Sequence, residues 1–161
     1  MAQEDRAKLY DLMEKIEIAM MTTIEGNGSL HTRPMANQKP DDNGDLWFFT
    51  EADGSVAQNI ASNPQVALGF SDPKSNGYVA ISGTGSVVRD RAKIDEKWNK
   101  DVEAWFPKGK DDPNIALIKV DPDRGELWDY PAGLISSVAA FVKSKIGGNP
   151  DEIGDNAKVM L

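Results

Sequence analysis

The 161-residue sequence contains no cysteine and only one histidine. Without cysteine, the chain forms no disulfide bond and offers no thiolate nucleophile, zinc thiolate site or iron–sulfur ligand. A catalytic triad based on histidine would have to use His31, and no G-x-S-x-G motif accompanies it. We therefore interpret His31 as an exposed or hydrogen-bonded strand residue.

Long apolar runs and an excess of positive charge are also missing. No apolar run approaches the ~20 residues of a membrane helix, and the charged start MAQEDRAKLY lacks the apolar segment of a secretory signal. The net charge is −8 and the lysines and arginines are scattered, which argues against nucleic acid as a partner. We expect a cytoplasmic protein that binds neither membrane nor nucleic acid.

Two glycine-containing stretches lack the spacing of a metal or phosphate loop. In DDNGD (41–45) the glycine comes too early for a calcium loop, and the closing glutamate is missing. The stretch SGTGS (82–86) lacks the lysine and the strand–turn–helix context of a phosphate loop. We predict a hairpin turn for the first, a kinked strand for the second, and no metal site.

Alternating apolar residues and turn signals predict a mainly antiparallel barrel or sheet with short helices, in one domain over residues 1–145. Gly83 and Gly85 predict a bend or bulge. Residues 146–161 lack periodicity and are expected to be a mobile tail or to pack on a partner. Helices are expected in 4–17, 91–106 and 133–145, and residues 51–63 are expected to form a loop followed by a short helix. Strands are expected at 18–25, 30–38, 45–50, 64–72, 76–90, 114–120 and 125–130, the last two joined by a turn at DPDRG.

The segment LHTRPMANQ (30–38) carries an arginine and a proline in the middle of a predicted strand. Alternation places Arg33 and Met35 on one face and Pro34 on the other. Because Pro34 has no N–H to donate, the strand should lie at a sheet edge or beside a gap. A cation beside an apolar side chain suits a planar ligand with an anionic tail. Taken alone, the pattern also fits a solvated arginine on an edge strand.

The segment FFTEADGSVAQNI (48–60) provides a second candidate. A strand ends in Phe49 and Thr50, and a helix follows through Gly54 and Ser55. Backbone amides at a helix start, together with a serine hydroxyl, form a natural phosphate site. A plain helix cap is the alternative.

Five motifs occur in an order that resembles a known family: LHTRPM, LWFFT with its serine-initiated helix, YVAISGTGSVV, KWNKDVEAWFPKGKDDPNIALIKV and ELWDY. The chain from about residue 5 to residue 131 resembles the pyridoxamine 5′-phosphate oxidase-like superfamily of FMN-binding split β-barrels, and within it the general stress protein 26 group. This resemblance implies a six-stranded antiparallel split barrel that forms a homodimer, with flavin bound at the interface between subunits.

The same resemblance implies the residues that contact the flavin. Arg33 to Met35 would run along the ring and its phosphate, Ser55 and the amide of Val56 would hold the phosphate, and Trp128 would approach from the partner subunit. The full set of expected cofactor-binding residues is Arg33, Pro34, Met35, Phe49, Thr50, Ser55, Val56, Trp105 and Trp128.

The chain departs from the oxidases of this superfamily at three places. Gln38 stands where an oxidase carries a lysine, and residues 55–57 lack a basic side chain near the helix start. The Arg-x-His motif that grips the oxidase substrate is missing after Trp128. These departures imply weaker FMN binding or acceptance of FAD, and they argue against pyridoxamine phosphate oxidation.

The sequence thus leads to a flavin-binding stress protein, FMN or FAD being the cofactor, with weak flavin-dependent oxidoreductase activity as one hypothesis. A dimeric module that stores or senses flavin without turnover is the alternative. A related barrel that binds deazaflavin F420 or haem is a third; haem would most simply use His31 as its axial ligand. No residue is assigned a catalytic role.

Overall fold

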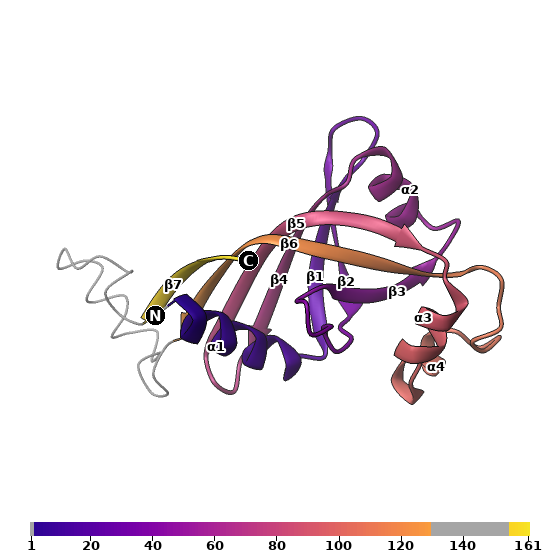
Figure 1. The fold of residues 1–161 in the computed structure, drawn as a ribbon. Coiled ribbons are helices and arrows are strands. Elements are labelled where there is room, and N and C mark those ends of the chain that lie inside the picture. Colours follow the sequence, from indigo (N-terminus) through magenta and orange to yellow (C-terminus); the bar gives the residue numbers. More distant parts are fainter. Residues whose placement is uncertain (1, 130–154) are drawn as a thin grey trace.

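The computed structural model describes residues 2–129 and 155–161, which form a curved sheet flanked by short helices (Figure 1). None of the described helices is long and apolar enough to cross a bilayer. The elements are α1 (Ala2–Glu14), β1 (Ile18–Ile24), β2 (Leu30–Ala36), β3 (Leu46–Glu51), α2 (Ser55–Ser62), β4 (Gln65–Asp72), β5 (Gly77–Val88), α3 (Arg91–Lys97), α4 (Lys100–Trp105), β6 (Ile115–Asp129) and β7 (Asp155–Met160).

The described strands form one antiparallel sheet in the order β2-β1-β4-β5-β6-β3, with β7 added to β6. The long strands β5 and β6 run the length of the molecule and join its two ends (Figure 1). At one end β6 pairs with β3, and at the other end it pairs with β7. The predicted fold class, a mainly antiparallel split barrel with short flanking helices, is confirmed.

The predicted turn at DPDRG is wrong, because these residues lie inside the continuous strand β6. Ser82 pairs with Arg124 and Gly83 pairs with Pro122, which leaves Asp123 as an extra residue on β6. A bulge at this point accommodates a proline that has no N–H for the ladder. The predicted irregularity at Gly83 is confirmed, and a Cβ there would overlap the carbonyl group of Asp121.

The single helix predicted over 91–106 is in fact two helices. α3 ends before Trp98, whose backbone is extended, and α4 begins after Asn99. The Asn99 side chain accepts hydrogen bonds from the amides of Asp101 and Val102, so it caps a new helix instead of continuing the old one. Trp105 consequently leaves the buried stripe and is 69% exposed.

The end of the expected tail is also ordered into the sheet. Residues Asp155–Met160 form β7, which pairs with Arg124–Asp129 of β6, and Val159 is buried in the main core. The sequence predicts a tail that is mobile or packed on a partner, whereas Asp155–Met160 pair with β6 of the same chain. The helix predicted over 133–145 lies outside the described residues.

Strand β2 lies at an edge of the sheet, as Pro34 predicted. Its ladder partner among the described strands is β1. Toward β3 it makes only the isolated bridge Asn37–Phe48, followed by a hydrogen bond from the Gln38 amide to the Trp47 carbonyl at 3.3 Å. The two strands then diverge, and the sheet stays open between them.

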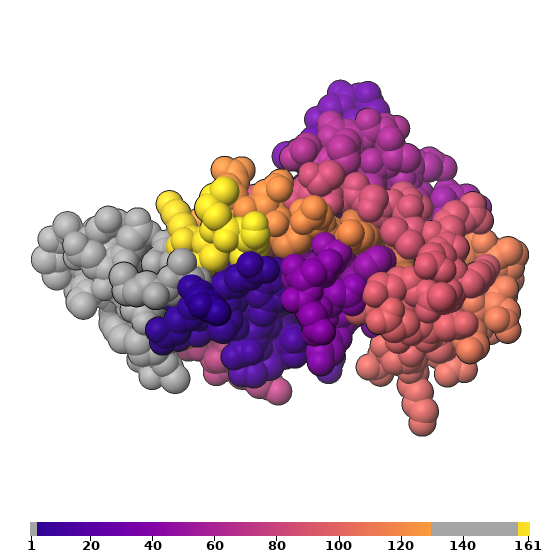
Figure 2. Space-filling model, in the orientation of Figure 1, coloured from indigo at the N-terminus to yellow at the C-terminus, as the bar shows by residue number. Residues whose placement is uncertain are grey.

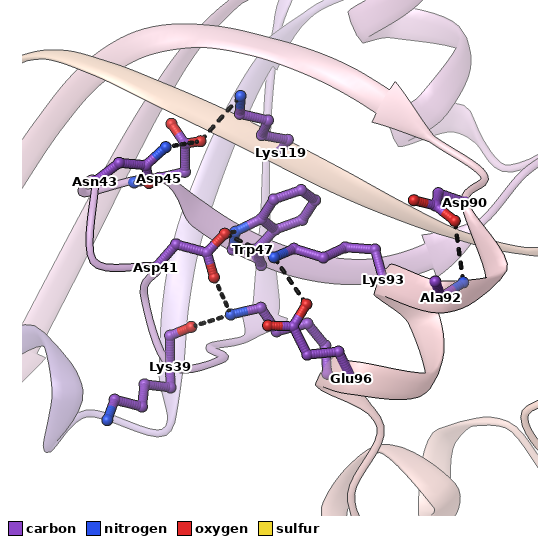
Figure 3. A network of polar contacts seen from close by, with 11 residues as sticks. Lys39, Asp41, Asn43, Asp45, Trp47, Asp90, Ala92, Lys93, Glu96 and Lys119 are labelled. Atoms are coloured by element: carbon purple, nitrogen blue, oxygen red, sulfur yellow. Dashed lines mark hydrogen bonds and ion pairs between the residues drawn. The ribbon is translucent and has the colours of Figure 1, made fainter.

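A carboxylate in the β2–β3 loop holds α3 against this end of the sheet (Figure 3). Asp41 accepts hydrogen bonds from Lys97 at 2.6 Å, Lys93 at 2.8 Å and the Trp47 indole at 2.9 Å. The ammonium group of Lys93 also lies 4.8 Å from the centre of the Trp47 ring. Burial by itself would raise the pKa of Asp41, but the hydrogen bonds from Lys93 and Lys97 outweigh it and lower that pKa below its ordinary value.

We predict that Asp41→Asn destabilises the fold by about 1–3 kcal/mol at pH 7, because hydrogen bonds to a charged group are lost. A carboxyl group whose pKa is lowered in the folded state stabilises the fold above its unfolded pKa of about 4, and this contribution disappears as the pH falls through the folded pKa. Urea unfolding at pH 7 and pH 3 should therefore show a gap between wild type and variant that shrinks in acid. The exposed neighbour Asp42 supplies the control, Asp42→Asn. An equal gap at both pH values would contradict the assignment.

Candidate functional site

The gap between β2 and β3 contains a cavity of about 360 Å³. Its walls come from the start of β1, from β2 and β3, from the start of α2, and from α4 with the residue after it. The lining residues are Ile18, Pro34, Met35, Ala36, Phe49, Thr50, Glu51, Gly54, Ser55, Val56, Val102, Trp105 and Phe106. Seven of the nine residues expected at the cofactor therefore line one cavity: Pro34, Met35, Phe49, Thr50, Ser55, Val56 and Trp105.

An aromatic cluster fixes the β3 side of the cavity. The Phe49 ring meets the Trp98 ring edge-on at 5.7 Å between centroids and lies 6.1 Å from the Phe106 ring. Phe49 is buried on β3, and Val102 and Leu117 belong to the same apolar cluster. Because these side chains hold one another, the cavity has a rigid apolar wall.

The start of α2 provides unpaired backbone donors at one end of the cavity. Gly54 is the residue before the helix and has an extended backbone, and Ser55 is the first helical residue. The first amide bonded within this helix is that of Gln58, which donates to the Gly54 carbonyl at 3.1 Å. The preceding amides of Ser55, Val56 and Ala57 have no partner inside the helix. An anion at this point would meet free N–H groups and the positive end of the helix dipole.

Arg33 lies beside this helix but does not line the cavity. Its Nη1 donates to the Thr23 hydroxyl at 2.8 Å, and Asn59 of α2 donates to the same oxygen at 3.1 Å. Its Nη2 is buried and has no hydrogen-bond partner in the described structure. Burial lowers the pKa of Arg33, while the charge of Glu25 acts in the opposite direction. A guanidinium group with an unsatisfied N–H favours a nearby anion.

Trp128 lies at the far end of the sheet from the cavity. It is half-buried on β6, where it pairs with Tyr78 of β5 and with Asn156 of β7. The space-filling view shows β7 and the lobe formed by α3 and α4 at opposite ends of the molecule (Figure 2). Trp128 therefore does not line the cavity of its own chain.

His31 is both exposed and in contact with a polar group, which agrees with our interpretation of it as an exposed or hydrogen-bonded strand residue. It is exposed, and its Nδ1 lies 3.0 Å from a carboxylate oxygen of Glu25. It does not line the cavity, so it offers no axial ligand to a haem bound there. In the described ranges, no cluster of three or more histidine, aspartate or glutamate side chains is arranged to hold a metal ion.

Sequence reasoning missed several lining residues. Val102 and Phe106 reach the cavity because α4 folds back against β3, and this tertiary contact leaves no local pattern. The position of Phe106 directly after Trp105, in the motif AWFP, was the available signal. Glu51 was also missed; it is exposed and is the only titratable side chain in the lining.

Comparison with known proteins identifies relatives of this chain and of its fold. The family model described as pyridoxamine 5′-phosphate oxidase like matches residues 4–152. Protein bli-3 of Neurospora crassa is 26% identical over 152 residues, covering 88% of this chain and 73% of its own length. General stress protein 26 of Bacillus subtilis is 27% identical over 128 residues, with coverage of 75% and 86%.

A solved structure shares both the fold and part of the sequence. The general stress FMN/FAD binding protein of Xanthomonas citri is 29% identical, with a TM-score of 0.71 over 83% of this chain and 94% of its own. The family model spans the whole described sheet except β7, and with it every element around the cavity. This chain therefore belongs to the pyridoxamine 5′-phosphate oxidase-like family, with general stress protein 26 among its relatives.

Proposed function

We propose that the cavity between β2 and β3 binds a flavin, FMN or FAD, and that the protein acts as a flavin-binding general stress protein. The observation that carries this proposal is the combination of an apolar, aromatic-walled cavity with free backbone amides at one end. A related structure at 29% identity is an FMN/FAD binding protein. A bound flavin would supply the redox chemistry, and the protein would supply position and electrostatics.

The apolar part of the cavity suits the flavin ring system. Met35 and Phe49 are buried side chains on the two diverging strands, and Pro34 is exposed at the edge. Trp105 is exposed at the rim, where its ring can cover a planar ligand. These side chains would hold the ring by contact and exclude water from it.

The end of the cavity at α2 suits the phosphate. The Ser55 hydroxyl and the amides of Ser55 and Val56 are the donors, and Arg33 lies beside the same helix, where it shares the Thr23 hydroxyl with Asn59 of α2. The exposed carboxylate of Glu51 also lines the cavity and would repel a phosphate. One nearby cation opposed by one carboxylate supports weaker flavin binding than in the oxidases of the family.

Gln38 does not replace the lysine that oxidases carry at its position. It is 6% exposed, does not line the cavity, and its Oε1 accepts a hydrogen bond from Asn99 at 2.7 Å. The residues after Trp128 are DYPAGL, without an arginine or histidine to grip a substrate phosphate. Both observations argue against pyridoxamine phosphate as the substrate.

Storage or sensing of flavin without turnover is the second candidate. Apart from Glu51, the lining offers no side chain that could transfer a proton. General acid–base catalysis requires such a group within hydrogen-bond reach. The lining therefore favours a binding role or a reaction carried by the flavin alone, such as electron transfer to a bound acceptor.

We also propose that two copies pair through the outer face of the sheet. On this face, Met20 of β1 lies opposite Pro34 of β2 on one side and opposite Gly69 of β4 on the other. Gly69 in turn lies opposite Ala80 of β5. Met20 is 45% exposed and Tyr78 is 36% exposed on this face, and an exposed apolar patch marks an interaction site. Trp128 pairs with the exposed Tyr78 on this same face, so a two-fold axis could bring it to the partner's cavity.

We predict that Arg33→Ala weakens FMN binding by about 1.5–3 kcal/mol, the scale of a charge-assisted hydrogen bond. Riboflavin has the same ring without the phosphate, so its affinity should change little. Fluorescence titration of both ligands provides the measurement, and Arg89→Ala, at an exposed arginine on another surface, is the control. An equal loss for FMN and riboflavin would place the effect on the fold and contradict a phosphate contact.

A second prediction concerns the outer sheet face. Ala80→Arg should convert a dimer into a monomer, because Ala80 lies at the centre of the face and the added side chain leaves no room for a flat contact. Sedimentation velocity gives the mass, and Ala61→Arg, at an exposed position of α2, is the matched control. A wild-type monomer, or a dimeric Ala80→Arg variant, would contradict this interface.

A further inference from the structure

We propose that a second recess beside the flavin cavity binds a small planar molecule that donates hydrogen bonds and carries no negative charge. This side recess has a volume of about 370 Å³ and lies between the first residues of β1, the end of β2 and the start of α4. It shares Ile18, Ala36 and Trp105 with the cavity, so the two spaces are neighbours with a common wall. Flavin binding does not account for it.

The charges around the side recess disfavour an anion. Two acidic residues, Glu17 and Asp101, and one basic residue, Lys100, belong to its lining. None of these three side chains forms an ion pair with any other residue in the described part of the chain. The recess therefore carries a net negative charge, within a chain whose net charge is −8. A neutral or cationic ligand gains from this field and an anionic one loses.

The amide groups of the side recess are held in fixed orientations. Asn37 donates from Nδ2 to the carbonyl groups of Met13 and Ile16, which identifies its other atom as Oδ1, a buried acceptor without a partner. The Asn99 side-chain oxygen caps α4, so its Nδ2 must be the donor to Gln38. The wall is thus a preformed polar surface.

Gln38 has donor capacity left over. It is 6% exposed, and its Nε2 makes one long hydrogen bond, at 3.3 Å, to the Ala36 carbonyl. A side-chain amide nitrogen has two N–H groups, so one remains for a ligand. The carboxylates of Glu17 and Asp101 accept hydrogen bonds, and the free N–H of Gln38 donates one. The recess therefore fits a ligand that has mainly hydrogen-bond donors and, in addition, one acceptor.

Trp105 supplies the planar surface. It is 69% exposed and belongs to the lining of both spaces. An indole ring stacks on flat ligands and attracts cations to its face. A planar molecule with amide or amidine groups would stack on the ring and donate hydrogen bonds to the carboxylates of Glu17 and Asp101 at the same time.

The position of the side recess along β2 suggests its relation to the flavin. In extended chain, the five residue steps from Arg33 on β2 to Gln38 just after it span about 16 Å. With the phosphate at α2, the recess lies at the opposite, ring end of the cavity, away from the point where the adenylate of FAD is attached. Its occupant would therefore lie beside the flavin ring, as an electron donor or acceptor does. The placement of the occupant beside the flavin ring rests on the proposed flavin site. The binding of a ligand in the side recess is independent of that site.

The test uses three probes of nearly equal shape: benzamidine, which is cationic, benzamide, which is neutral, and benzoate, which is anionic. The purified full chain labelled with ¹⁵N is titrated with each probe, and the side-chain amide signals of Asn37, Gln38 and Asn99 are followed by NMR. We expect these signals to shift, with benzamidine binding about two- to fivefold more tightly than benzamide, the scale of an exposed charge pair, and benzoate binding weakest. Signals that do not move, or tightest binding of benzoate, would overturn the proposal.

Near-isosteric variants separate charge from folding. Glu17→Gln and Asp101→Asn should remove most of the preference for benzamidine over benzamide while benzamide still binds. Asp111→Asn, at an exposed residue outside both linings, should leave the preference intact. Trp105→Ala should weaken benzamidine and benzamide alike. An unchanged preference in Glu17→Gln and Asp101→Asn together would contradict the electrostatic basis of the proposal.

A competition experiment distinguishes this inference from the proposed function. If FMN and benzamidine bind together, the recess lies beside the occupied cavity as inferred. If FMN displaces benzamidine, the two sites overlap and the placement beside the ring is wrong. If the chain binds benzamidine but no FMN, the proposed flavin function fails while the recess remains a binding site.

Discussion

Everything around the cavity depends on the point at which β2 and β3 stop pairing. Asn37 and Phe48 form an isolated bridge, and the Asn37 side chain is tied to the carbonyl groups of Met13 and Ile16. These bonds fix the end of β2 to the corner between α1 and β1. Before this point, Pro34 has no N–H to offer another strand, so the gap does not close. The open edge, usually a liability, becomes the site where a ligand can be enclosed.

The other walls are held by an ion-pair network outside the cavity and by an aromatic cluster within its wall. Asp41 binds Lys93 and Lys97 of α3 to the β2–β3 loop, and the ring of Phe49 packs on Trp98 and Phe106. The lobe of α3 and α4 thereby presents Val102, Phe106 and Trp105 to the gap. The lobe is joined to the sheet by this ion-pair network and by a buried apolar cluster that includes Ile94 and Val102.

Local chemistry made a large part of this arrangement predictable from the sequence. Pro34 indicated an edge strand, and Gly54 with Ser55 indicated the helix start that lines the cavity. Pro122 and Gly125 were misleading, since residues that usually mark a turn lie in a bulged strand. The break between α3 and α4 was missed because Ile94, Trp98 and Val102 continue a helical period across it.

The remaining features depend on tertiary contacts that no local pattern encodes. The hydrogen bond from Arg33 to Thr23, the approach of Phe106 to Phe49, and the polar wall built from Gln38 and Asn99 all join residues from different elements. The bond between Gln38 and Asn99 spans 61 positions in the chain. Such contacts determine which donors remain free, and therefore which ligand is accepted.

The central claim is that this chain encloses a flavin ring between β2 and β3. The visible absorption spectrum of the purified protein, recorded before and after addition of FMN and removal of unbound ligand, tests it most directly. Enclosure predicts that the flavin bands stay with the protein and that their positions differ from those of free FMN. A colourless protein after this treatment, with all the FMN recovered in the wash, would contradict the claim.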